Sequence, residues 1–144
     1  MFSFKMLLFA LTLTLLAVTV QSWSDGNLSG PELTRLYNSP VYEAERLKRP
    51  KGSSSSAVGP FSHSGVRVTL GDRSKWLIHK GMNYGTSSQT VVTRADYMSS
   101  NWKVVKTGNF QGRKTVGDFV ATGGSNYDFL FDNCHWASIR MMNQ

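Results

Sequence analysis

The chain has 144 residues and carries a formal net charge of +7, from 16 Lys and Arg against 9 Asp and Glu. Hydrophobic residues make up 40% of the sequence and aromatic residues 12%, which predicts one compact domain and excludes a highly charged, disordered chain. The single cysteine excludes an intramolecular disulfide and a thiolate-rich zinc or iron–sulfur site, because each of these needs several cysteines.

Residues 1–22 have the three-part pattern of a secretory signal peptide. Lys5 precedes an apolar run over residues 6–20, and Val20 and Ser22 place small residues at the alternate positions that signal peptidase requires. The alternative is a membrane anchor, but this run is interrupted by threonines and is shorter than the ~20 residues that span a bilayer. We therefore expect a secreted, extracellular protein whose mature chain has no transmembrane segment.

Residues 23–60 are predicted to be a polar lead-in that ends in a serine-rich linker. Ser29 can cap a short helix, and Pro31 suits its first turn, with residues 32–37 continuing it. The four consecutive serines up to Ser56 favour a flexible connector. We expect the folded domain to occupy residues 61–144.

Two processing signals lie in this lead-in. Asn27 begins an acceptor sequon for N-glycosylation, which is a common motif. The basic run ending at Arg49 is typical of a dibasic cleavage site, but Pro50 disfavours cleavage because proline restricts the scissile peptide. The sequence leaves open whether either site is used.

From residue 61 onward the pattern predicts an α+β fold with an antiparallel sheet packed against a few helices. Apolar and polar residues alternate on both sides of the turn at Gly71 and Asp72, which predicts a hairpin. Thr115 and Asn133 are suitable helix caps. In chain order we expect strands at 66–70, 75–79 and 89–93, a helix at 94–100, a strand at 102–106, a helix at 116–121, a strand at 127–131 and a helix at 134–142.

Cys134 is an unpaired cysteine in a chain predicted to be secreted. Such a thiol is an intermolecular bridge, a buried inert residue or a thiol kept for reaction. Its predicted place in the first turn of a helix favours the thiolate, because free N–H groups and the helix dipole stabilise an anion there. An imidazole nearby would complete the activation.

His63 and His79 are the candidate partners for this thiol. His63 opens the predicted hairpin and His79 ends its second strand, so antiparallel pairing brings them to one end of the sheet. Whether they share a face depends on a register that the sequence does not fix. His63 can serve as the base and His79 can orient it.

These residues resemble the circularly permuted papain-like fold, whose members include the lecithin:retinol acyltransferase family and permuted relatives of NlpC-type cell-wall peptidases. The resemblance covers roughly residues 61–140, with its specific content around the two histidines and around Asn133 and Cys134. It implies Cys134 as nucleophile, His63 as base, His79 as third member of the site, and backbone N–H groups near Cys134 as the oxyanion site. The segment Asn133–Trp136 departs from the acyltransferases' usual Asn-Cys-Glu-His, since it lacks the acidic residue.

Two functions follow from the sequence. The first is a thiol-dependent hydrolase or acyltransferase that acts on an amide or ester substrate through Cys134, His63 and His79, without a cofactor or a metal. The second is a non-catalytic binding domain whose basic face holds an anionic cell surface, lipid or glycan. No nucleic-acid recognition motif is visible. The basic residues of this face are predicted to be Arg67, Arg73, Lys75 and Lys80 on the hairpin and Lys103, Lys106, Arg113 and Lys114 on the later strand.

Overall fold

The computed structural model describes residues 28–50, 62–80, 90–125 and 132–144. These contain three α-helices and five strands, which confirms the expected α+β class. The strands form one antiparallel sheet in the order β4-β3-β2-β1-β5. The elements are α2 (Gly30–Tyr37), β1 (Pro40–Pro50), β2 (Ser62–Leu70), β3 (Lys75–Lys80), β4 (Thr90–Arg94), a short 3-10 helix η2 (Ala95–Tyr97), β5 (Lys103–Thr115), α3 (Val116–Gly123) and α4 (Cys134–Met142).

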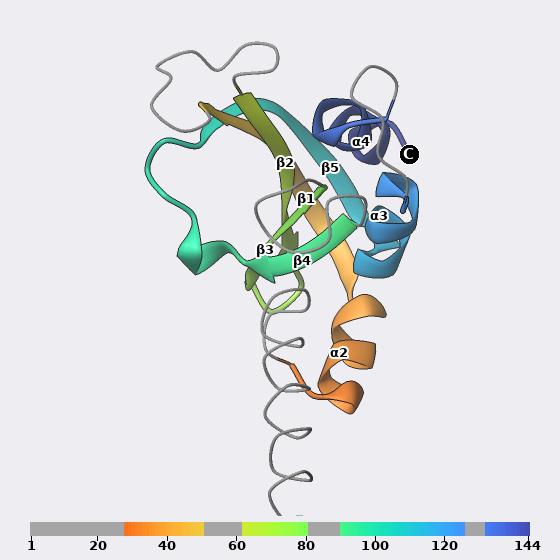
Figure 1. Cartoon of the computed structure of the whole chain (residues 1–144). Coiled ribbons are helices and arrows are strands. Elements are labelled where there is room, and N and C mark those ends of the chain that lie inside the picture. Colours follow the sequence, from red (N-terminus) through yellow and green to blue (C-terminus); the bar gives the residue numbers. More distant parts are fainter. Residues whose placement is uncertain (1–27, 51–61, 81–89, 126–131) are drawn as a thin grey trace, which may run out of the picture.

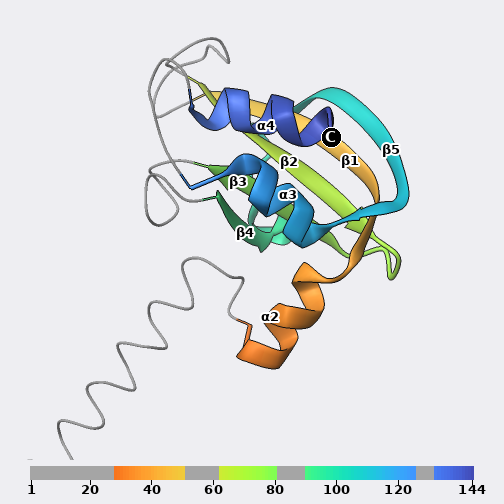
Figure 2. The ribbon, with the colours of Figure 1, turned by 90° about the vertical axis from the view of Figure 1, so that its right-hand side faces the viewer.

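The helices α3 and α4 lie side by side on one face of the sheet (Figure 2). The main hydrophobic core fills the space between them and the strands, where each buried side chain stabilises the fold by removing apolar surface from water. A smaller cluster of Leu47, Leu77 and Trp102 covers part of the opposite face. The main core includes Val66, Val68, Ile78, Phe119, Ala137 and Met141.

The predicted hairpin is confirmed as β2 and β3, joined by the turn at residues 71–74. Alternation buries Val66 and Val68 against the core. In the turn, Asp72 accepts hydrogen bonds from the backbone N–H and the hydroxyl of Ser74, at 2.9 and 2.6 Å. Figure 1 shows this turn at the end of β2 that is distant from α4.

The predicted caps of the last two helices are also confirmed. The Thr115 hydroxyl accepts from the N–H of Asp118, whose carboxylate accepts from the N–H of Thr115. Asn133 Oδ1 accepts from the N–H groups of His135 and Trp136. Each cap satisfies donors that have no partner within the helix, so these helices begin where the sequence predicts.

The expected domain boundary at residue 61 is wrong, because β1 lies inside the sheet between β2 and β5. Val41, Ala44 and Leu47 are buried, while charged residues of both signs occupy most positions between them. The strand was not predicted because it has few apolar residues among its charged ones. In addition, a bulge after Val41 breaks the strict alternation that marks a strand. The basic run before Pro50 is part of this strand.

Two later expectations are corrected as well. The helix expected at 94–100 is only the single turn η2, and the strand expected at 102–106 continues as β5 to Thr115. Backbone pairing with the long β1 extends β5 through polar residues that carry no strand pattern of their own. The signal peptide at 1–22, Asn27, the serine-rich linker and the strand expected at 127–131 lie outside the described residues.

Candidate functional site

The two predicted histidines contact one another. Gly65 pairs with His79, which places His63 and His79 on the same face of the sheet. The Nε2 of His63 lies 3.2 Å from the Nδ1 of His79, and both residues are buried. A Cβ on Gly65 would lie 3.1 Å from the Cβ of His79, so the absence of a side chain at residue 65 allows this close arrangement.

Burial and a neighbouring cation keep His79 neutral. Burial lowers the pKa of His79 to about 4, and the positive charge of Arg49 acts in the same direction. The Arg49 guanidinium lies over the ring of Trp102, 5.3 Å from its centroid, and His63 meets the same ring edge-on. The pair is therefore enclosed by Arg49 and Trp102.

Cys134 lies on the other side of the sheet from this pair. Ser62 and Ser64 contact His135 of α4, so these residues of β2 face the helices. Because side chains alternate along a strand, His63 points to the opposite face, where it meets Trp102. Within the described residues the structure thus brings His63 and His79 together but does not bring Cys134 to them.

The first turn of α4 has its own polar surroundings. Both ring nitrogens of His135 contact serine hydroxyls, Nε2 that of Ser62 at 3.3 Å and Nδ1 that of Ser64. Arg46 Nε donates to the Ser138 hydroxyl at 2.8 Å. Burial lowers the pKa of Arg46, and the charge interaction with Cys134 opposes this. The thiol itself is buried, at 2% exposure, so it is not presented to a large substrate.

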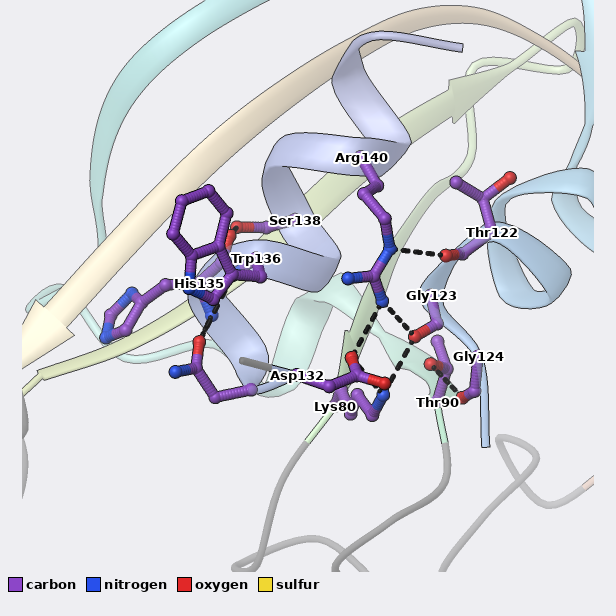
Figure 3. Close-up of polar contacts among 11 residues, drawn as sticks. Lys80, Thr90, Thr122, Gly123, Gly124, Asp132, His135, Trp136, Ser138 and Arg140 are labelled. Carbon is purple, nitrogen blue, oxygen red and sulfur yellow. Dashed lines mark hydrogen bonds and ion pairs between the residues drawn. The ribbon is translucent and has the colours of Figure 1, made fainter. Parts of the chain in front are cut away.

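An ion cluster around the buried Lys80 joins β3, α3 and α4 near this end of the sheet (Figure 3). Lys80 Nζ donates to Asp132 at 2.7 Å and to the Gly123 carbonyl at 3.1 Å. Arg140 donates to the same two acceptors, each at 2.9 Å. Burial raises the pKa of Asp132, but the hydrogen bonds from Lys80 and Arg140 outweigh this and hold it below its usual range. Lys80, expected on a basic surface, is fully buried here, so that assignment is corrected.

At the other end of the β2–β3 hairpin lies a cavity of about 430 Å³. Its lining contains four basic residues and one acidic residue, Asp96. Glu45 forms an ion pair at 2.7 Å with one of the four, Arg67. The lining residues are Arg67, Arg73, Ser74, Lys75, Trp76, Arg94, Ala95 and Asp96.

Arg94 is the residue of this cavity that the sequence did not reveal. Strand β4 brings it to the hairpin because Arg94 pairs with Trp76, and its guanidinium lies 5.5 Å from the centroid of the Trp76 ring. No local motif announces such a pairing, since it depends on the register between two strands. Arg67, Arg73 and Lys75, by contrast, are the cations that the hairpin pattern itself placed together.

Comparison of the chain with protein-family models, with curated proteins and with solved structures finds no match. Among the described residues, no three His, Cys, Asp or Glu side chains are grouped so that they could hold a metal ion. No helix within the described ranges is both long and apolar enough to cross a membrane.

Proposed function

We propose that the protein is a secreted, non-catalytic binding domain that holds polyanionic surfaces through the cationic cavity at the β2–β3 turn. The observation that carries this proposal is that Arg73, Lys75 and Arg94, from the turn and from the ends of two strands, all line one cavity. All three are exposed, so a ligand outside the protein can reach them. Secretion is proposed from the signal-peptide pattern of residues 1–22.

Basic residues outside the cavity support the same proposal, because their electrostatic field acts over a longer distance than a direct contact. Lys103, Lys106 and Arg113 are exposed along β5 and add to the positive field of a chain whose net charge is +7. Such a field raises the encounter rate with anionic surfaces, whereas the cavity supplies short contacts. Binding of this kind weakens as salt screens the charges.

The test is retention of the mature chain on an immobilised sulfated polysaccharide, eluted with a salt gradient. A variant with Arg73→Gln, Lys75→Gln and Arg94→Gln should elute at much lower salt than the native chain. Its matched control carries Lys103→Gln, Lys106→Gln and Arg113→Gln, which removes the same charge from β5. Equal shifts for the two variants would reject the cavity as the binding site, and Cys134→Ser should leave retention unchanged.

A second candidate function is a thiol hydrolase or acyltransferase of the permuted papain-like fold, acting on an amide or ester bond. Its support is the position of Cys134 in the first turn of α4, where its charge interacts with that of Arg46. His135 is the imidazole on the same side of the sheet. This proposal requires that the buried thiol become accessible to a substrate.

Alkylation of Cys134 by iodoacetamide separates the two functions. A catalytic thiolate paired with His63 reacts quickly near neutral pH and loses this reactivity in His63→Ala. A buried structural thiol reacts only when the fold opens, so the destabilising His63→Ala change should accelerate alkylation instead. The structure leads us to expect acceleration, and a slower reaction would favour the enzyme. His135→Ala gives the corresponding test for the imidazole of α4.

A further inference from the structure

We infer that the outer edge of β5 is a docking surface for an extended acidic segment of another protein, which adds a strand beside residues 103–107. This surface lies outside the cavity, and the inference goes beyond the proposed function. Among the described strands, β5 pairs only with β1 and forms one border of the sheet (Figure 2). A border strand presents a row of backbone N–H and C=O groups with which an added strand can pair.

The first five residues of β5 expose side chains on both faces of the sheet. Residues 103–107 are all exposed, whereas β2 and β3 are buried along most of their length. Val104 and Val105 are 46% and 50% exposed, and they are two of the four exposed large hydrophobic residues in the described part of the chain. An added strand would cover both valines and remove apolar surface from water.

Two pairs of like charges lie directly opposite each other where this part of β5 joins β1. Lys103 is opposite Lys48, and Lys106 is opposite Arg46. Opposed side chains of neighbouring strands have Cβ atoms about 5 Å apart, so each of these pairs is repulsive. Within the described residues, none of the four cations takes part in an ion pair. Carboxylates bound beside them would relieve the repulsion.

The strand register separates the charges from the valine. Arg46 donates to Ser138 of α4, so its partner Lys106 lies on the helix face of the sheet as well. Positions two apart on β1 share a face, so the second like-charge pair also lies there. Val104 is opposite Leu47, which belongs to the small cluster on the other face. A matching strand therefore alternates carboxylates on the helix face with apolar side chains on the other.

The charge of β5 selects an acidic partner over a second copy of this chain. Residues 103–115 include four basic residues and no acidic one. Two copies of β5 placed side by side would repel each other, and lysines on edge strands commonly prevent self-pairing in this way. An acidic segment is attracted by the same charges and then pairs with them. A glycan or lipid anion would use the charges but neither the backbone groups of the edge nor the valines.

The experiment measures, by fluorescence anisotropy, how a labelled peptide of Glu-Val repeats binds to the mature chain. Two control peptides carry the same charge. One has the order Glu-Glu-Val-Val, which breaks the alternation, and the other is N-methylated at every residue, which removes its backbone donors. We expect the alternating peptide to bind about tenfold more tightly than either control. In the isotope-labelled chain, amide chemical shifts should change most at residues 103–107.

Variants of the chain locate the surface. Lys103→Gln with Lys106→Gln should weaken peptide binding about tenfold, because the pairs with two carboxylates are lost. The matched control, Arg113→Gln with Lys114→Gln, removes the same charge from the far end of β5 and should change binding less than about twofold. Val104→Ser should weaken binding about threefold, because it removes an apolar contact.

The outcomes separate strand addition from simple charge attraction. Equal binding of all the peptides, or equal effects of the two double variants, would overturn the inference. Dimerisation of the native chain that Val104→Ser abolishes would overturn it in favour of a second copy. The cavity variant with Arg73→Gln, Lys75→Gln and Arg94→Gln should keep peptide binding within about twofold. A tenfold loss in that variant would show that the peptide responds to net charge alone, and would also overturn the inference.

Discussion

The two ends of strand β2 use polar residues in opposite ways. At the end that begins with Ser62, His63, His79 and Lys80 are buried, the two histidines contact one another, and Lys80 is paired with Asp132. At the end that reaches Leu70, the basic side chains are exposed around a cavity. The first end contains the residue types of catalysis, whereas the second has a cavity lined by basic residues.

This difference teaches that residue type alone does not locate a functional site. Near one end lie four residues with chemically reactive or ionisable groups, and all four are buried among neighbouring side chains: Cys134, His63, His79 and Lys80. Groups that satisfy one another stabilise the fold, whereas like charges that gather without equal compensation favour a ligand. The following predictions contrast these two uses.

The largest effect is expected for Asp132→Asn at the first end. The change leaves the buried ammonium of Lys80 without its charged partner and should lower the free energy of unfolding by about 3 kcal/mol. The matched control, Asp96→Asn at the cavity, is exposed and should change it by less than about 0.5 kcal/mol. Urea unfolding measures both, and similar values for the two variants would contradict the comparison.

The second effect is a loss of stability in acid from His79. Its pKa in the folded chain is about 4, against 6.5 for the unperturbed residue. Above pH 6.5 both states are neutral and the stability is complete, while between pH 6.5 and 4 only the unfolded state takes up the proton. The free energy of unfolding should therefore fall by about 3 kcal/mol over this range.

Urea unfolding from neutral pH down to pH 4 measures this dependence. His79→Gln removes the titrating group and should flatten the curve in this range, while His135→Gln should preserve it. A native curve without the fall would show that His79 is protonated in the folded chain.

The smallest effect is expected at the cavity, where Arg73→Gly should leave stability unchanged or raise it by up to about 1 kcal/mol. Glycine adopts the left-handed conformation of residue 73 without strain. The same change at Arg113, which is not in that conformation, should lower stability, because glycine weakens a strand interior. Thermal unfolding compares the two variants. Polysaccharide retention should fall more for Arg73→Gly, and the reverse order would contradict a cavity specialised for binding.

Local signals were sufficient for several elements. The hairpin followed from the alternation on both sides of Gly71, and the last two helices followed from Thr115 and Asn133. Strand β1 escaped prediction because its alternation is interrupted and its surface is charged. Its place in the sheet depends on pairing with β2 and β5, which no local window of sequence contains.

The sequence by itself determined the net positive charge, the helix caps and the hairpin, because each depends on residues that are close together in the chain. Only the tertiary structure decided which chemistry-bearing residues meet. The strand register joined His63 to His79 and brought Arg94 to Trp76, while the packing of α4 placed Cys134 across the sheet from the histidines. A shift of one residue in a strand reverses the face of every side chain, so such juxtapositions are fixed by long-range packing.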